Sequence, residues 1–231
     1  MLFAPLDNDH APPTLGTREV HLWSVDIDAA SLPHLLALLS DDERDRVARY
    51  FREMDRARFV VVRAALRTLL GRYLQTPPEA IGFYDGPHGK PHLRATGDRR
   101  LHFNVSHSGG LALLAFCETQ EVGVDVERVR DMADAERMAR RFFTPGEAEQ
   151  WAGFPPDLRL RAFFELWTRK EAYAKALGRG VTSDAVRLPD PQDEEWSIFD
   201  VSPSAAYAAA LAIPGRGWDL QSWTMGPGQT F

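Results

Sequence analysis

The chain has 231 residues, of which 44% are hydrophobic and 26% charged, a composition typical of globular domains. Its formal net charge of -6 gives the surface no general attraction for nucleic acid. No apolar run approaches the roughly 20 residues that cross a membrane, and the first residues lack the pattern of a signal peptide. Cys117 is the single cysteine, which excludes an intrachain disulfide. We therefore expect a cytoplasmic protein with a buried thiol and neither nucleic-acid nor membrane partners.

The first 80 residues predict a strand followed by two arginine-rich helices. Residues 1–18 are rich in proline and polar residues and predict a loose lead-in, whereas residues 20–27 alternate as a half-buried strand does. Ser40 and Glu43 have the spacing of a capping box, which opens a helix. A second helix is predicted over 55–74, with a stop at residues 76–78.

Between residues 40 and 75 the chain is locally basic, with nine arginines against six acidic residues. Such a segment could bind a small anionic ligand. The alternative is a solvated helix face with ion pairs between successive turns.

The middle of the chain predicts several short strands. A strand is expected over 81–84, followed by a loop rich in glycine and proline that carries Lys90. The apolar segments 101–105 and 111–117 predict a hairpin joined by the turn SHSGG. A further strand over 122–126 puts Asp125 and Glu127 on the same face.

The last part of the chain mixes helices and strands. Helices are predicted over 134–142, over 145–151 with a capping box at Thr144 and Glu147, and over 158–178. Short strands are expected around 185–188, 196–201, 206–213 and 218–223. The elements do not alternate strictly between strand and helix, which favours an α+β fold over a doubly wound sheet.

An acidic residue interrupts the apolar stripe of the helix predicted over 158–178. Glu171 lies near the middle of this stripe, which is formed by Leu160, Phe163, Phe164, Trp167 and Ala174. Burying an unpaired carboxylate costs several kcal/mol, so Glu171 needs a basic partner, a proton or a metal ion. Taken alone, a structural ion pair with a nearby arginine is the more common explanation of such an acid.

Three carboxylates could meet if this helix packs against the strand over 122–126. Asp125, Glu127 and Glu171 would then supply the oxygen ligands that Mg²⁺ prefers, while phosphate oxygens and water complete its coordination. Alone, the two strand acids could equally be a solvated strand edge.

Three basic side chains could complete such a site. His107 could donate a hydrogen bond to a phosphate, and Lys170 and Lys175 flank Glu171, with Lys175 one turn along the same face. Together with the acids they indicate a Mg²⁺-assisted site for phosphate chemistry. Individually, a histidine in a turn is ordinarily just exposed, and a lysine four residues after a glutamate is ordinary support for a helix.

Five segments occur in a characteristic order: GKP at 89–91, FNVSHSGG at 103–110, GVDVE at 123–127, FFTPGE at 142–147 and WTRKEAYAKALGRG at 167–180. In this order they resemble the 4′-phosphopantetheinyl transferases, in particular the longer, surfactin-synthetase-activating type. A weaker match in RFVVVRAALRTLL at 58–70 extends the resemblance over roughly residues 40–180.

The resemblance implies transfer of the 4′-phosphopantetheine group from coenzyme A to a serine of an apo acyl or peptidyl carrier protein, with Mg²⁺ as cofactor and 3′,5′-ADP as product. It also implies an α+β fold of two similar α/β halves related by pseudo-two-fold symmetry. Each half would be a small, mainly antiparallel sheet packed with helices, with the active site in the cleft between them.

The two halves would comprise residues 1–118, which bind the nucleotide of coenzyme A, and residues 119–231, which carry the acids and the catalytic helix. Two halves within one chain favour a monomer.

The resemblance also implies roles for single residues. Asp125, Glu127 and Glu171 would be the Mg²⁺ ligands, and Glu171 or a metal-bound water would be the base for the carrier serine. His107 and Lys175 would act with Glu171 by holding pyrophosphate oxygens.

The remaining coenzyme A contacts are implied by position in the matching motifs. Ser106 would add a hydroxyl donor, Lys90 and Pro91 would line the nucleotide pocket, and Lys170 would be secondary to Lys175 because it projects off the apolar stripe. Basic residues at the 3′-phosphate and adenine would be Arg46, Arg58 and Arg63.

One residue departs from the family pattern. Glu43 stands where some relatives offer a second lysine to the 3′-phosphate, so this protein is expected to bind that group differently.

Two other functions use the same parts. A Mg²⁺-dependent phosphohydrolase or nuclease would replace the carrier serine by water, although the net negative charge disfavours a nuclease. A non-catalytic nucleotide-binding module would account for the acids and leave the lysines and His107 without a role.

Overall fold

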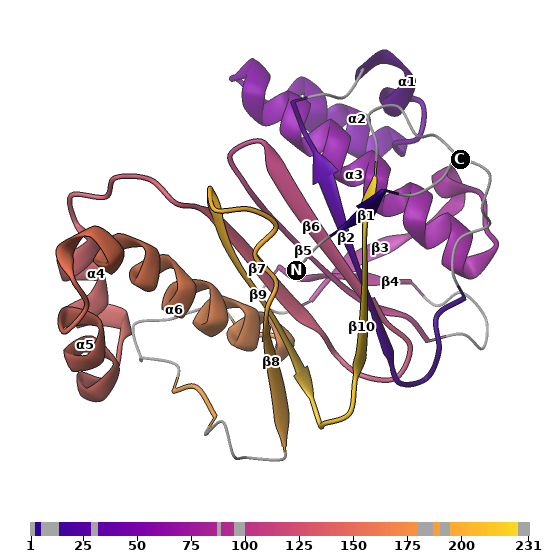
Figure 1. Cartoon of the computed structure of the whole chain (residues 1–231). Helices are drawn as coiled ribbons and strands as arrows, with labels where there is room; N and C mark the ends of the chain where they lie inside the picture. Colours follow the sequence, from indigo (N-terminus) through magenta and orange to yellow (C-terminus); the bar gives the residue numbers. More distant parts are fainter. Residues whose placement is uncertain are drawn as a thin grey trace.

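The structure is a computed structural model that describes residues 3–5, 14–28, 32–86, 89–94, 100–179, 187–189 and 195–225. None of the helices in these ranges is long and apolar enough to cross a membrane. In chain order (Figure 1) the elements are β1 (Ala4–Pro5), β2 (Glu19–Asp26), α1 (Leu32–Leu36), α2 (Asp41–Ala48), α3 (Glu53–Leu74), a 3₁₀ helix (Pro78–Ala80), β3 (Phe83–Asp85), β4 (Pro91–Leu93), β5 (His102–Ser108), β6 (Leu111–Cys117), β7 (Gly123–Arg128), α4 (Ala135–Phe142), α5 (Pro145–Ala152), α6 (Pro156–Ala176), β8 (Trp196–Asp200), β9 (Tyr207–Pro214) and β10 (Asp219–Met225).

The strands form two main sheets. The large sheet has the order β1-β10-β2-β6-β5 and the small sheet the order β7-β9-β8, while β3 and β4 form a separate pair. All pairs are antiparallel except those that β10 makes with β1 and β2. The expected α+β fold of small, mainly antiparallel sheets packed with helices is therefore confirmed.

Strand β10 comes from the last part of the chain but belongs to the large sheet, between β1 and β2. Its residues from Asp219 to Met225 lie in parallel register with Glu19 to Val25. The division into two halves at residue 118 stays a prediction, since this pairing carries the chain back across that boundary.

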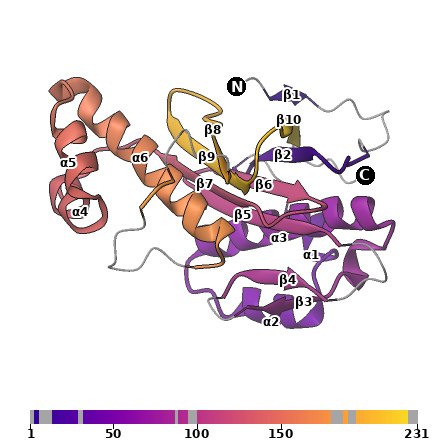
Figure 2. The ribbon, with the colours of Figure 1, turned by 90° about the horizontal axis from the view of Figure 1, so that it is seen from below.

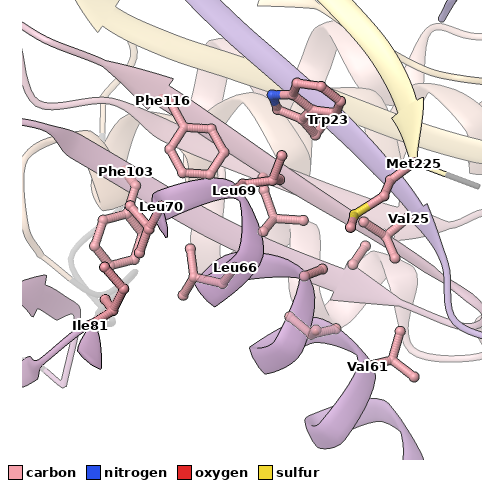
Figure 3. Packing of buried hydrophobic residues seen from close by; sticks show 14 of the residues in the cluster. Trp23, Val25, Val61, Leu66, Leu69, Leu70, Ile81, Phe103, Phe116 and Met225 are labelled. Carbon is pink, nitrogen blue, oxygen red and sulfur yellow. The ribbon is translucent and has the colours of Figure 1, made fainter. Parts of the chain in front are cut away.

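The first core lies between the large sheet and α3 (Figures 2 and 3). Leu66, Leu69 and Leu70 of α3 pack against the sheet, where Trp23 and Phe116 are fully buried. This confirms the predicted helix over 55–74, which begins two residues earlier than expected.

The second core lies between the two sheets, so β2 is buried on both faces. Val20 and Leu22 pack here with apolar residues of β6, β7 and β9. The prediction of a half-buried β2 is therefore wrong, because the second part of the chain covers the face that was expected to meet solvent. Cys117 is fully buried in this core, as predicted.

The helix starts follow their capping residues. Ser40 and Glu43 form the predicted capping box of α2, and Thr144 and Glu147 form that of α5. α4 and α6 also lie where they were predicted, and Gly178 follows α6 with a φ of +68°.

The strand predictions need several corrections. β1 lies within the expected lead-in, and β4 lies within the expected loop that carries Lys90. The turn between β5 and β6 consists of Gly109 and Gly110 alone, and the preceding Ser-His-Ser continues β5. β3 begins at Phe83 rather than at residue 81. Of the strand expected at 185–188, the first two residues lie outside the described ranges, and the structure shows no strand at 187–189.

α6 packs directly against the backbone of β7. A Cβ atom at Gly123 would overlap the carbonyl oxygen of Ala172 and come within 2.5 Å of the backbone nitrogen of Ala176. Only glycine therefore allows this approach of helix to strand.

We predict that Gly123→Ala destabilises the protein by about 1–3 kcal/mol, the usual cost of overpacking. The measurement is thermal unfolding of the purified protein. Gly146→Ala is the matched control, because a Cβ at Gly146 in α5 would meet no atom within 4 Å. Its melting temperature should stay the same or rise slightly. A Gly123→Ala protein that melts at the wild-type temperature would contradict the prediction.

Candidate active site

The two sheets meet edge to edge at β5 and β7, which run side by side in the same direction. Alternate side chains of β5 accept hydrogen bonds from backbone N–H groups of β7. These bonds are Val124 N to Asn104 Oδ1 at 2.8 Å, Val126 N to Ser106 Oγ at 3.3 Å, and Arg128 N to Ser108 Oγ at 3.1 Å. We call these three bonds the β5–β7 seam.

Two serines of the seam also bind the two acids of β7. Ser106 Oγ donates to Asp125 Oδ1 at 2.8 Å, and Ser108 Oγ donates to Glu127 Oε2 at 2.6 Å. Asp125 is only 4% exposed. Ser106, which was expected to meet a pyrophosphate, is itself buried and occupied by these bonds.

α6 places two charged side chains above Asp125. Lys175 Nζ donates to Asp125 Oδ1 at 2.6 Å and to Ser106 Oγ at 3.1 Å. Burial raises the pKa of Glu171, and the charges of Asp125 and Glu127 raise it further. No ion pair with an arginine involves Glu171 in the described part of the chain, so the structure offers no support for the simpler explanation of this acid.

Glu127 belongs to the same electrostatic group. Burial raises its pKa and Asp125 adds to the rise, against the lowering by its bond to Ser108. The structure thus brings Asp125, Glu127 and Glu171 within reach of one another's charge. Repulsion among carboxylates is typical of sites that bind cations or move protons.

The acids suit a metal ion in their chemistry. As the side chains stand, no three acidic, histidine or cysteine side chains among the described residues converge closely enough to hold one. However, Asp125 Oδ2 is buried without a hydrogen-bond partner. An orphaned carboxylate oxygen next to two further carboxylates fits a hard cation such as Mg²⁺.

A pocket of about 530 Å³ lies at the opposite face of β5. Val105 and His107 line it, since they alternate with the serines of the seam. The same wall contains Arg46, Arg58, Arg63 and Pro91. The structure therefore brings five of the predicted coenzyme A contacts together with the strand that binds the acids.

The pocket is electrostatically prepared for an anion. Arg58 Nε and Arg63 Nη1 are buried and have no hydrogen-bond partner in the described structure. Burial and the charge of Arg58 lower the pKa of His107, with a smaller contribution from Lys175. His107 is consequently neutral near pH 7 and can donate one hydrogen bond.

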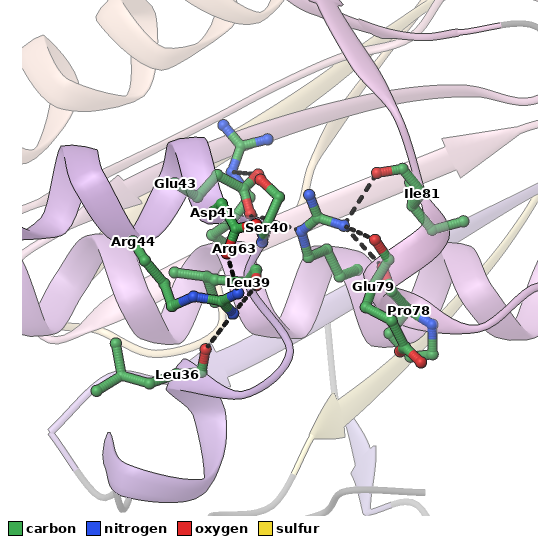
Figure 4. Close-up of polar contacts among 11 residues, drawn as sticks. Leu36, Leu39, Ser40, Asp41, Glu43, Arg44, Arg63, Pro78, Glu79 and Ile81 are labelled. Carbon is green, nitrogen blue, oxygen red and sulfur yellow. Dashed lines mark hydrogen bonds and ion pairs between the residues drawn. The ribbon is translucent and has the colours of Figure 1, made fainter.

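Glu43 has a structural role beside the pocket (Figure 4). Its carboxylate accepts from Ser40 N at 3.0 Å and from Arg67 Nε at 2.7 Å, and lies 3.4 Å from Arg63 Nε. Arg67 also donates to the carbonyl oxygen of Ile81 at 2.9 Å. The acid that departs from the family pattern therefore holds Arg63 in place at the pocket wall.

Two predicted lysines already have carboxylate partners. Lys170 is fully buried and donates to Glu147 Oε2 at 2.7 Å, so it does not project away from the helix packing, and we correct its expected contact with coenzyme A. Lys90 Nζ donates to Glu121 Oε2 at 2.6 Å and to the carbonyl oxygen of Lys175 at 3.2 Å. Its ammonium group therefore ties the pocket loop to α6 rather than lining the pocket.

Sequence reasoning missed Asn104 and Ser108. Asn104 fell in a segment predicted as a strand from its apolar residues, and Ser108 fell in the predicted turn SHSGG. The polar residues at 104, 106 and 108 nevertheless have the period of a strand. This alternation would have revealed the seam.

Two family profiles match most of the chain. The profile of the 4′-phosphopantetheinyl transferase superfamily matches residues 121–223, and that of the 4′-phosphopantetheinyl transferase N-terminal domain matches residues 26–119. The 4′-phosphopantetheinyl transferase HetI of Nostoc sp. is 38% identical over 225 residues, which cover 91% of this chain and 94% of the relative. The chain belongs to the 4′-phosphopantetheinyl transferase family.

Within this family, similarity extends to the 4′-phosphopantetheinyl transferase Sfp of Bacillus subtilis. The two proteins are 29% identical over 196 residues, which cover 78% of this chain and 84% of Sfp. The phosphopantetheinyl transferase described here thus matches relatives along most of their length, and its seam joins one strand from each of the two regions that the family profiles match.

The acids of the transferase site lead to a stability prediction. Glu171→Gln should raise the melting temperature of the metal-free protein at pH 7.5, because it removes a partly buried charge that Asp125 and Glu127 repel. Since Glu171 is partly open to solvent, screening keeps the gain small, about 2–4 °C at roughly 1 kcal/mol. Differential scanning calorimetry in the presence of a chelator measures it.

Glu147→Gln is the matched control with the opposite sign. It leaves the fully buried Lys170 without its carboxylate, a change that typically costs about 3–5 kcal/mol. If Glu171→Gln lowered the melting temperature as Glu147→Gln does, Glu171 would be half of a structural ion pair and the repulsion argument would be wrong.

Proposed function

We propose that transfer of the 4′-phosphopantetheine group from coenzyme A to a carrier-protein serine takes place across strand β5 and depends on Mg²⁺. The observation that carries this proposal is that successive side chains of β5 point alternately to the pocket and to the acids. Val105 and His107 face the pocket, whereas Ser106 and Ser108 bind the acids. A substrate with a nucleotide at one end and a pyrophosphate in its middle would meet both faces.

The nucleotide would occupy the pocket of about 530 Å³. Arg58 and Arg63 have unused buried donors there, which suit the 3′-phosphate, and Arg46 adds a third guanidinium group. Pro91 and Phe59 provide apolar surface for the adenine. Glu43 keeps Arg63 oriented, in place of a direct contact from a lysine.

The pyrophosphate would lie between His107 and the acids. His107 is neutral and donates one hydrogen bond, and Lys175 contributes a positive charge from above Asp125. Asp125, Glu127 and Glu171 would hold Mg²⁺, which when bound neutralises the negative charge of the phosphate oxygens.

Glu171 is our candidate for the base. Its pKa is raised toward neutral pH, which makes its carboxylate a stronger proton acceptor than that of an ordinary glutamate. The proton of the carrier serine passes to Glu171, the serine oxygen forms a bond to the phosphorus next to pantetheine, and the bond from that phosphorus to the leaving 3′,5′-ADP breaks.

All of these groups come from one chain, so we propose that a monomer suffices. A cytoplasmic setting agrees with the single, free and buried cysteine.

The transfer itself is tested by mass spectrometry. We expect an apo acyl or peptidyl carrier protein, incubated with the protein, coenzyme A and Mg²⁺, to gain the mass of one phosphopantetheine group, and a chelator to prevent the gain. No gain with several carriers, together with release of phosphate from an ester, would instead indicate a phosphohydrolase.

A second experiment tests the pocket. Dephospho-coenzyme A lacks the 3′-phosphate, so its KM should be about ten-fold higher, as the loss of a charge-assisted hydrogen bond worth about 1.5 kcal/mol implies. Arg58→Gln should raise the KM of coenzyme A and reduce this difference between the two donors.

Arg140→Gln serves as the control for charge alone. Arg140 lies on α4, where it forms an exposed ion pair with Glu136. This variant should discriminate between the two donors as the wild type does. Equal KM values of both donors for the wild type would exclude the 3′-phosphate from the arginine pocket.

A further inference from the structure

Ser108 occupies the end of the seam nearest to Glu127. Its hydroxyl oxygen accepts a hydrogen bond from Arg128 N at 3.1 Å, and the hydroxyl lies 2.6 Å from Glu127 Oε2. A backbone N–H can only donate and an ionised carboxylate can only accept. The single hydroxyl proton of Ser108 is therefore committed to Glu127, and the backbone of the next residue fixes the direction in which it points.

Glu127 needs such a fixed donor more than Asp125 does. Asp125 is held by two groups, Ser106 and Lys175. Within the described structure, the bond from Ser108 is the one side-chain hydrogen bond that Glu127 receives. Its side chain is longer and partly exposed, so without this bond it would sample several rotamers. Fixing one of them would then cost conformational entropy.

Asn104 provides an internal comparison. Its side chain makes the same kind of bond across the seam, from Val124 N at 2.8 Å, and is buried. Unlike Ser108, it makes no hydrogen bond to a carboxylate among the described residues. The stability of the seam and the orientation of an acid can therefore be separated by substitution.

From this geometry we infer that Ser108 is a positioning residue that orients Glu127 toward a divalent cation and so sets the affinity of the transferase for Mg²⁺. The inference rests on the proposed function, in which Glu127 is a metal ligand. Groups that orient a ligating carboxylate typically change metal affinity by about 10–100-fold when they are removed.

The test compares full-length variants in two assays. Ser108→Ala should raise the Mg²⁺ concentration at half-maximal transfer about ten-fold, with an unchanged KM for coenzyme A. Ser108→Thr keeps the hydroxyl and should retain the wild-type value. Mn²⁺ binding in the presence of coenzyme A, followed by electron paramagnetic resonance, should weaken in Ser108→Ala by the same factor, independently of turnover.

Asn104→Ala is the matched control for the seam. It should lower the melting temperature, because Val124 N loses its buried partner, and leave the Mg²⁺ dependence at the wild-type value. An equal Mg²⁺ shift in Asn104→Ala and Ser108→Ala would overturn the inference, as would an unchanged Mg²⁺ requirement in Ser108→Ala. If Ser108→Ala does not fold, Ser108→Cys, which donates only weakly, is measured in its place with the same expected shift.

The wild-type protein distinguishes this inference from the proposed function. A wild type that transfers phosphopantetheine without any dependence on a divalent cation would refute the Mg²⁺ site itself. A Mg²⁺-dependent wild type with an indifferent Ser108→Ala variant would refute the role of Ser108 alone.

Discussion

The structure depends on how two sheet edges are joined without a backbone ladder between them. β5 and β7 each end a sheet, and unpaired edge strands invite association with other chains. Here the side chains of Asn104, Ser106 and Ser108 satisfy the N–H groups of β7. The junction is polar, so it can border a site for charged groups, yet it is satisfied, so it costs little to bury.

Side chains of like charge lie close together around the junction, and packing holds them there. Burial and the charge of Asp125 raise the pKa values of Glu127 and Glu171, and Lys175 offsets only part of the repulsion. Gly123 lets α6 approach β7 closely enough for this arrangement. Such local conflict within a consistent fold is expected at functional sites, where a bound ligand supplies the missing charge.

Local signals in the sequence were sufficient for much of the fold. Capping boxes located α2 and α5, and the apolar stripe of α6 made Glu171 conspicuous as an acid that needed a partner. The error at SHSGG arose because turn-forming residues were given more weight than the alternation that preceded them. Lys170 was misjudged because its partner Glu147 lies on a different helix, which no periodicity of α6 reveals.

The long-range features could not be read from local pattern. The burial of both faces of β2 depends on the small sheet, and the position of β10 depends on a pairing between the two ends of the described chain. The resemblance to a family predicted that the three acids lie at one site, a question that composition and spacing left open. The geometry then assigned Ser106 and Glu43 to supporting roles that the motifs alone did not distinguish from direct contacts.

The pairing of β10 with β2 also constrains how the protein comes to be folded. A nascent chain can form α2, α3 and the β5–β6 hairpin as soon as they emerge, since their contacts are local. The large sheet, however, lacks an inner strand until residues 219–225 have been synthesised. Until then one edge of β2 is unpaired, and contacts between residues so far apart in the sequence form slowly. Completion of the large sheet therefore waits for strand β10, and an unpaired strand edge of this kind favours association with other chains.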